Sequence, residues 1–173
     1  MGMTKSVFGK TSNGEVVHLV TVSNQKGMSI EVLDYGATLV SVNVPDKDGH
    51  TEDVALGYDD VLDYEKGDAY LGATVGRCGN RVDHAEFSIN GKEYFMEKNE
   101  GENVCHSAPR CYSRRMWDME LLEEENSVRF HLVSPNMDQG FPGTFEVTVT
   151  YILTEENELK IHYNGTCDQD SLI

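Results

Sequence analysis

Short runs of residues in which apolar side chains recur at every second position dominate this sequence. Alternation with a period of two is typical of strands with one buried face, whereas an amphipathic helix repeats about every 3.6 residues. The clearest signal is Glu86–Ile89 and Lys92–Phe95 around Asn90-Gly91, because Asn-Gly accepts the positive φ angles of a two-residue hairpin turn. The longest run, Phe145–Leu153, is rich in β-branched residues. The pattern therefore predicts an all-β fold of the sandwich or barrel type.

Further strands are predicted where similar runs lie between turn residues. They are Val16–Val22, Met28–Leu33, Leu39–Val44, Asp53–Leu56, Trp117–Leu122, Val128–Val133 and Leu159–Tyr163. A short turn around Tyr58–Tyr64 is the one helix candidate, and Glu97–Arg115 and Ser134–Gly143 are predicted to be long loops. Long loops on a rigid β scaffold are where function tends to lie.

The charge balance excludes several classes of partner. The chain has 14 Lys and Arg against 30 Asp and Glu, which gives a formal net charge of −16. A chain this acidic repels phosphate backbones and anionic lipid, so we expect no nucleic-acid partner and no membrane-surface binding. No apolar run approaches the length of a transmembrane helix. The start of the chain fits the short myristoylation pattern, but an extra start codon or a cloning remnant is the preferred interpretation.

The four cysteines and the absence of an apolar leader point to a reducing compartment. The four do not form a C-x-x-C pair, and their number is too small for a disulfide scaffold in 173 residues. Free thiols and a cytoplasmic location are therefore expected.

Common cofactor and metal signatures are missing from the sequence. It has no Gly-rich phosphate loop and no dinucleotide fingerprint, and its six histidines are scattered. A zinc site is therefore unsupported, and we expect no metal and no cofactor. His131 and His162 fall in predicted strands that could face each other, although two surface positions are the better interpretation.

Two segments could carry chemistry. Gly72–Val82 places two arginines and an asparagine among small residues, and the Arg fork suits hydroxyl, carbonyl or carboxylate oxygens. The alternative is a pair of structural ion pairs in a very acidic protein. Asn99–Ser107 places His106 in a polar loop, and a loop histidine that folds against an Arg-Asn cluster indicates a site for a polar ligand.

These segments also carry a resemblance to a known family. The matching pieces occur in the family's order and span nearly the whole chain. They are Tyr35–Ser41, Glu52–Tyr58, Gly76–Val82, Glu86–Gly91, Gln139–Gly143 and Val147–Tyr151. On these motifs the chain resembles the N-terminal half of an aldose 1-epimerase, also called galactose mutarotase.

The resemblance implies a galactose mutarotase-like β-supersandwich that interconverts the α and β anomers of hexoses such as galactose and glucose without a cofactor. In this chemistry a general base takes the proton of the anomeric hydroxyl while a general acid protonates the ring oxygen. The family's sugar-binding residues carry over onto Asn80 and Arg81. Its loop histidine, which contacts the sugar near the reacting atoms, carries over onto His106 as both a substrate-binding and a catalytic residue.

The sequence also departs from the family pattern. Two glycines usually follow the histidine, where this chain has Ser107 and Ala108, and the aromatic often found after the first arginine is Cys78 or Gly79 here. The family's second histidine, thought to be the general acid, and its glutamate base have no counterpart in this chain. Residues 1–173 are thus expected to be the truncated N-terminal part of a single sandwich domain, inactive alone.

Two alternatives remain open at this stage. One is an epimerase acting on phosphorylated hexoses, for which Arg110, Arg114 and Arg115 could supply positive charge. The other is a non-catalytic carbohydrate-binding β-sandwich, which needs no acid–base pair. We also expect self-association through unpaired strands, with Phe145–Leu153 as the most exposed strand.

Overall fold

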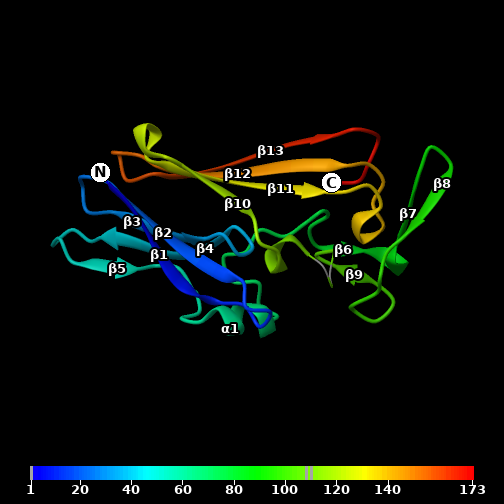
Figure 1. The fold of residues 1–173 in the computed structure, drawn as a ribbon, viewed down its shortest axis with the longest axis horizontal. Helices are drawn as coiled ribbons and strands as arrows, with labels where there is room; N and C mark the ends of the chain where they lie inside the picture. The colour runs from blue at the N-terminus through cyan, green and yellow to red at the C-terminus, as the bar shows by residue number, and fades with distance from the viewer. Residues whose placement is uncertain (1, 108, 110) are drawn as a thin grey trace.

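Two antiparallel sheets stacked face to face form the body of the molecule (Figure 1). The computed structural model describes residues 2–107, 109 and 111–173. The first sheet has the order β1-β2-β3-β4-β5, and the second has the order β10-β11-β12-β13. Their bounds are β1 Gly2–Lys10, β2 Val16–Ser23, β3 Ser29–Leu33, β4 Thr38–Pro45, β5 Thr51–Asp53, β10 Asp118–Leu122, β11 Ser127–Ser134, β12 Phe145–Leu153 and β13 Leu159–Cys167.

The main hydrophobic core lies between these two sheets. Alternate residues of the central strands point inward, and Val20, Ile30, Phe130, Val149 and Tyr151 are at most 2% exposed. Burying one face of each sheet explains the period of two that the sequence shows. The all-β sandwich prediction is therefore confirmed.

A smaller cluster covers the outer face of the first sheet. Helix α1 (Val61–Lys66) places Val61 and Tyr64 against Val17 and Leu33. The Asp60 side chain accepts a hydrogen bond from the Leu62 amide at 2.7 Å, which caps the helix. The helix therefore begins later than the short turn predicted around Tyr58–Tyr64.

Two small ladders lie together at one end of the sandwich (Figure 1). In one, β6 (Arg81–Val82) pairs with β9 (Val104–Cys105). In the other, β7 (Glu86–Ile89) pairs with β8 (Lys92–Phe95), so the Asn-Gly hairpin is confirmed with its predicted bounds. Short 3₁₀ turns complete the connections: η1 Asp83–Ala85, η2 Tyr112–Arg114, η3 Glu123–Glu125 and η4 Asp138–Gly140.

The prediction of the most exposed strand was wrong. Strand β12 lies between β11 and β13, and its alternate side chains are buried, so Phe145–Leu153 is not the exposed strand. Strand β13 lies at one edge of this sheet, and most of its side chains are exposed. His131 pairs with Thr148 and His162 with Thr150, so β12 separates the two histidines, and the structure agrees with the preferred interpretation that they do not face each other.

The start of the first sheet also differs from prediction. Strand β1 was not predicted, because its pairing with β2 shifts between Val7 and Gly9 and this irregularity breaks the alternation. Strand β5 ends at Asp53, and the apolar residues Val54 and Leu56 that suggested a strand are 69% and 77% exposed. The predicted strand Asp53–Leu56 is therefore wrong.

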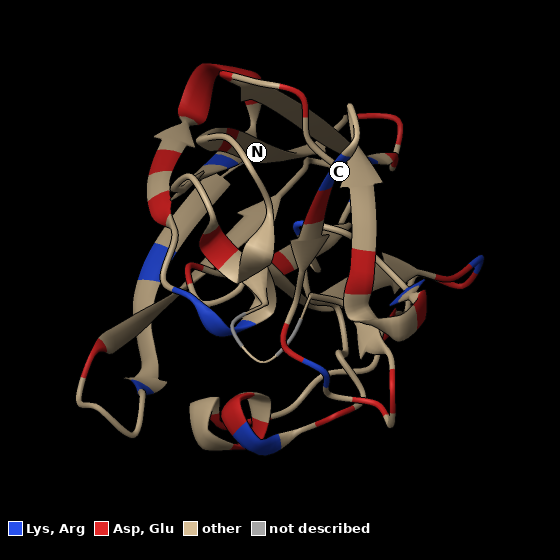
Figure 2. Cartoon of the chain, turned by 90° about the vertical axis from the view of Figure 1, so that its right-hand side faces the viewer, with Lys and Arg blue, Asp and Glu red and all other residues tan. Residues whose placement is uncertain are grey.

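The negative charge is a property of the whole surface. Figure 2 shows acidic residues spread over both sheets, α1 and the connecting loops. All four cysteines are free thiols. Within the described part of the chain, no helix combines the length and apolar character needed to cross a membrane.

One buried hydrogen bond ties the two sheets together, and its loss should be measurable. The Tyr151 hydroxyl donates to the Ala37 carbonyl at 2.7 Å, and Tyr151 is only 2% exposed. In Tyr151→Phe we expect the free energy of unfolding to fall by about 1 kcal/mol, the usual net value of one hydrogen bond. The loss stays modest because Thr74 also donates to that carbonyl. Urea unfolding of both proteins measures it, and a loss well above 3 kcal/mol would contradict this assignment.

The edge position of β13 predicts salt-dependent self-association. Ile161 and Tyr163 are 38% and 63% exposed on this edge strand, and an exposed edge can pair with another chain. The charge of −16 opposes contact, but 0.15 M salt screens it beyond roughly 8 Å. Residues 1–173 are therefore expected to associate more at 0.15 M than at 0.01 M salt, and less after Ile161→Lys, as measured by light scattering. A monomer under both conditions would refute the prediction.

Candidate functional site

The short ladder between β6 and β9 brings the three candidate residues together. Arg81 pairs with Cys105, so Asn80 and His106 extend the ladder by one residue on each strand. The His106 amide donates to the Asn80 carbonyl at 2.9 Å, and the Asn80 amide donates to His106 Nδ1 at 3.0 Å. The structure thus places Arg81 next to the His106 loop, as the shared-site hypothesis requires. The roles of the three residues in binding and catalysis remain a prediction.

The backbone at this point is unusual. Asn80, His106 and Ser107 have φ angles of 63°, 56° and 55°, in the left-handed region that few residues other than glycine adopt. Such conformations persist only where the surroundings hold them, and they cluster at ligand-binding and active sites. The strain therefore supports a functional interpretation of this loop pair.

The contact between Asn80 and His106 fixes the protonation pattern of the imidazole. A backbone N–H can only donate, so His106 Nδ1 accepts with its lone pair. The proton of the neutral ring then lies on Nε2, which becomes a hydrogen-bond donor. The Tyr70 ring packs against the imidazole with a centroid distance of 4.9 Å and further restricts its orientation.

This tautomer can be tested directly. Two-dimensional ¹H–¹⁵N NMR of the imidazoles at pH 8 is expected to show His106 with unprotonated Nδ1 and protonated Nε2. His162, exposed on the edge strand, serves as the control and should show averaged tautomers. A protonated Nδ1 on His106 would contradict the hydrogen bond from Asn80.

Arg81 is held by a carboxylate on the loop that leads to β9. Its Nε and Nη2 donate to Glu100 at 2.5 and 2.7 Å, and its Nη1 donates to Asn80 Oδ1 at 3.2 Å. The Arg81 hydrogen bond lowers the pKa of Glu100, and the same contact raises the pKa of Arg81. Both side chains are exposed, so water screens the pair. An incoming hydroxyl can therefore share or replace it.

Ser107, where the resembled family usually has a glycine, uses its hydroxyl to bind the neighbouring loop. Its hydroxyl accepts from the Cys78 amide and donates to the Cys78 carbonyl, both at 2.9 Å. The residue is buried and its left-handed backbone is accommodated. The extra side chain therefore binds the His106 loop to the Gly76–Asn80 loop, while Ala108 lies outside the described residues.

The two arginines of the Gly-rich segment have different environments. Arg77 is 4% exposed, whereas Arg81 is exposed. Arg77 Nη1 donates to the Pro142 carbonyl at 2.8 Å and Nη2 to Ser134 Oγ at 2.8 Å. Its guanidinium also lies 5.5 Å from the Phe145 ring centroid. Arg77 is therefore part of the scaffold, and Arg81 alone faces the surface.

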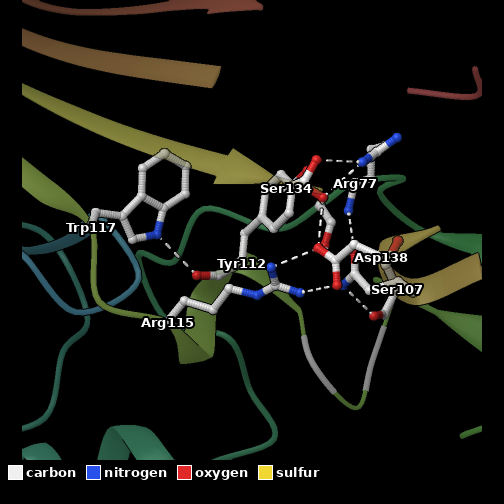
Figure 3. Close-up of polar contacts among 9 residues, drawn as sticks. Arg77, Ser107, Tyr112, Arg115, Trp117, Ser134 and Asp138 are labelled. Carbon is white, nitrogen blue, oxygen red and sulfur yellow. Dashed lines mark hydrogen bonds and ion pairs between the residues drawn. The ribbon is translucent and has the colours of Figure 1, made fainter. Parts of the chain in front are cut away.

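A buried polar network continues from Arg77 to η4 (Figure 3). Ser134 Oγ donates to Asp138 at 2.6 Å, and Arg115 donates to both Asp138 oxygens at 2.6 and 3.0 Å. Burial alone would raise the pKa of Asp138, but the hydrogen bonds from Arg115 and Ser134 outweigh burial and hold this pKa below its ordinary value. The network fixes the base of the loops that carry the candidate site.

These contacts weaken the phosphorylated-sugar alternative. Arg115 binds Asp138, and Arg114 donates to the Gly67 carbonyl at 3.3 Å. Arg110 lies outside the described residues. The two arginines thus have protein partners that a phosphate would have to displace.

The candidate site is separate from a cavity that lies near it. A cavity of about 270 Å³ is lined by Phe95, Glu97, Pro109, Met137, Asp138, Gln139 and Gly140. Asn80, Arg81 and His106 are absent from that lining, and the first two are exposed. Among the described residues no group of three or more His, Cys, Asp and Glu side chains could hold a metal ion.

Tyr70 and Glu100 are members of this site that the sequence did not single out. Glu100 lay within a highlighted loop, but nothing in its spacing indicated Arg81 as its partner. Tyr70 lay in an irregular segment without a motif. The one available signal was the presence of an acidic residue, Glu100, in the same loop as His106, since an acid can bind a nearby arginine.

Comparisons with known proteins identify the family of this chain. The profile of the family described as Aldose 1-epimerase matches residues 18–173. The aldose 1-epimerase of Haemophilus influenzae is 40% identical over 161 residues, which cover 93% of this chain and 46% of that protein. The galactose mutarotase of Sus scrofa is 33% identical over 171 residues, covering 98% and 48%.

Solved structures give the same result for the fold. The galactose 1-epimerase of Lactobacillus acidophilus matches with a TM-score of 0.85 and 26% identity over 99% of this chain and 50% of that one. An aldose epimerase homologue from C. elegans matches with a TM-score of 0.83 and 35% identity, covering 90% and 47%. The chain spans about half the length of these relatives. On the profile match, the sequence relatives and the shared sandwich, the chain belongs to the aldose 1-epimerase family.

Proposed function

We propose that the protein carrying this chain interconverts the α and β anomers of a hexose such as galactose or glucose. The observation that carries the proposal is the β6–β9 pairing, which brings Asn80, Arg81 and His106 from two loops into neighbouring positions. In the proposal the Asn80 amide, the Arg81 guanidinium and His106 Nε2–H donate to the sugar. Converging polar groups are what a site needs to bind and orient a cluster of sugar oxygens. The names of the relatives support the same chemistry.

The reaction needs two proton movements. A base removes the proton of the anomeric hydroxyl, the bond between the anomeric carbon and the ring oxygen breaks, and an acid protonates that oxygen. Rotation about the exposed aldehyde and the reverse steps give the other anomer. Because no electrons leave the sugar, proton transfer alone completes the reaction.

In this proposal His106 binds an oxygen near the breaking bond. Its Nδ1 is occupied by the Asn80 amide, so in the neutral ring Nε2–H donates to the sugar. A donor aimed at an oxygen that gains negative charge stabilises the transition state. The acid and the base are proposed to come from residues outside this chain.

Polarimetry tests the proposal. The full-length protein that carries this chain should accelerate the mutarotation of α-D-glucose or α-D-galactose. Residues 1–173 alone should give no acceleration above a heat-treated control. Acceleration in proportion to the amount of residues 1–173 would show that His106 with Arg81 suffices and that the missing acid–base pair is not required.

A non-catalytic sugar-binding sandwich is the second candidate. It is favoured by the exposed donors of Asn80 and Arg81, which bind hydroxyls without any proton transfer. Saturable galactose binding by the gene-length protein with no acceleration of mutarotation would select this candidate.

The free thiols support a proposal for the cellular location. We propose a cytoplasmic location because Cys78, Cys105, Cys111 and Cys167 are all free. We also propose that residues 1–173 are part of a single sandwich domain, since one core cluster joins β2 and β3 to β11 and β12.

A further inference from the structure

The Gln139 side chain lies between the two loops of the candidate site. Its Nε2 donates to the Ser107 carbonyl at 2.6 Å and to the Gly76 carbonyl at 3.1 Å, while its Oε1 accepts from the Arg77 amide at 3.2 Å. One amide thus connects the residue after His106 to the peptide group between Gly76 and Arg77, which precedes Asn80 and Arg81 in the chain. These partners are backbone groups, so the contacts fix the paths of the loops.

Gln139 is itself held on a rigid base. It lies in η4 with a left-handed backbone, at φ 55° and ψ 16°. Asp138, directly before it, is bound by Arg115 and Ser134. Directly after it, a side chain on Gly140 would place Cβ 2.1 Å from the Phe95 carbonyl oxygen. The turn therefore has little room to move, so Gln139 holds the backbone groups that it binds in fixed positions.

The amide complements the clamp made by Ser107. The Ser107 hydroxyl joins the His106 loop to Cys78, and Gln139 joins the same loop to Gly76 and Arg77. The hydrogen bond between the Asn80 amide and His106 Nδ1 lies just beyond these two clamps. Its geometry depends on the separation of the loops that the clamps set.

We propose that Gln139 is a positioning residue of the sugar site, which acts by holding the His106 loop against the Gly76–Asn80 loop. The proposal rests on the proposed function for its consequence in catalysis, but not for its structural part. The contacts described for Gln139 are to the backbone of Gly76, Arg77 and Ser107 and not to the side chains of Asn80, Arg81 or His106. Its effect reaches the sugar through the orientation of the His106 ring.

The chemistry of the contact distinguishes glutamine from glutamate. Both amide hydrogens of Gln139 point at carbonyl oxygens. A carboxylate in the same place would have no hydrogen to donate to the Gly76 and Ser107 carbonyls. Its negative oxygens would also repel the two carbonyl oxygens. A protonated carboxyl regains one donor, so a Gln139→Glu protein should recover as the pH falls.

The structural arm of the test uses hydrogen exchange and imidazole NMR. In Gln139→Glu at pH 8 we expect the Asn80 amide to exchange at least tenfold faster than in the wild type and the His106 ring nitrogens to shift. Measured against the wild type at the same pH, both differences should be smaller at pH 5.5. Gln139→Ala should show the same loss without the pH-dependent recovery. Gln25→Glu, the same change in the exposed β2–β3 turn, is the matched control. The Val149 amide in the core reports global stability.

The catalytic arm of the test uses the full-length protein that carries this chain. Gln139→Glu should lower kcat/KM for mutarotation at least tenfold at pH 8 relative to wild type, and less at pH 5.5. Unchanged Asn80 exchange and His106 shifts would overturn the proposal. Equal acceleration of exchange at Asn80 and Val149 would also overturn it, because the effect would then be global. An inactive wild-type protein would count against the proposed function alone, since the structural arm still decides the role of Gln139.

Discussion

Arg81→Ala and His106→Ala are each expected to lower kcat/KM for mutarotation by at least tenfold, about 1.4 kcal/mol of transition-state stabilisation. Arg81 presents an exposed guanidinium whose fork is bound by the screened carboxylate of Glu100. His106 presents Nε2–H because Asn80 occupies Nδ1. In the proposed site each substitution removes donors to the sugar oxygens at the reacting end, so the loss should appear in kcat as well as in KM.

Controls for this prediction come from the second sheet, outside the β6–β9 ladder. Arg129→Ala removes a partly exposed arginine that binds Glu120 on the second sheet, and His162→Ala removes an exposed histidine of the edge strand. Both should leave the kinetics unchanged. Arg81→Lys should recover less than half of the lost activity, because an ammonium cannot reproduce the planar fork. Wild-type kinetics in Arg81→Ala and His106→Ala would refute the shared site.

The local parts of the fold could be predicted because they depend on neighbouring residues. The β7–β8 hairpin depends on Asn90-Gly91, and β12 depends on a continuous alternating run, so both have their predicted bounds. Strand order depends on contacts between distant segments. The sequence therefore did not reveal that β12 is central and β13 lies at the edge.

The candidate site shows the same division. Asn80, Arg81 and His106 were found through a family resemblance, and the β6–β9 ladder explains why they meet. The partners Glu100 and Gln139 depend on how loops close over one another, which no spacing encodes. Arg77 and Arg81 lie four positions apart in one motif, yet Arg77 is buried and Arg81 is exposed. The spacing of a motif does not indicate which of its residues the fold buries.

The Asp138 carboxylate, which is partly buried beneath the loops of this site, takes part in an ion pair whose removal should lower stability. In Asp138→Ala we expect the free energy of unfolding to fall by about 2–4 kcal/mol, toward the range for breaking a buried ion pair. The side chains of Arg115 and Asp138 are 20% and 11% exposed, and Ser134 shares the carboxylate. Urea unfolding at pH 7 measures the loss. Asp118→Ala is the control, because the Asp118 side chain is 96% exposed, and an equal effect of the two substitutions would contradict the prediction.

The pH dependence of this contribution has a definite sign. The pKa of Asp138 in the folded protein is lowered from 3.8, so the folded state favours the ionised carboxylate. The stabilisation is therefore fully present above the unfolded-state pKa and is lost as the pH falls through the lower folded-state value. The difference in unfolding free energy between the wild type and Asp138→Asn should be constant from pH 7 to pH 5 and should shrink below about pH 4. A difference that grows on acidification would mean that Asp138 is protonated in the fold and that the ion pair with Arg115 does not form.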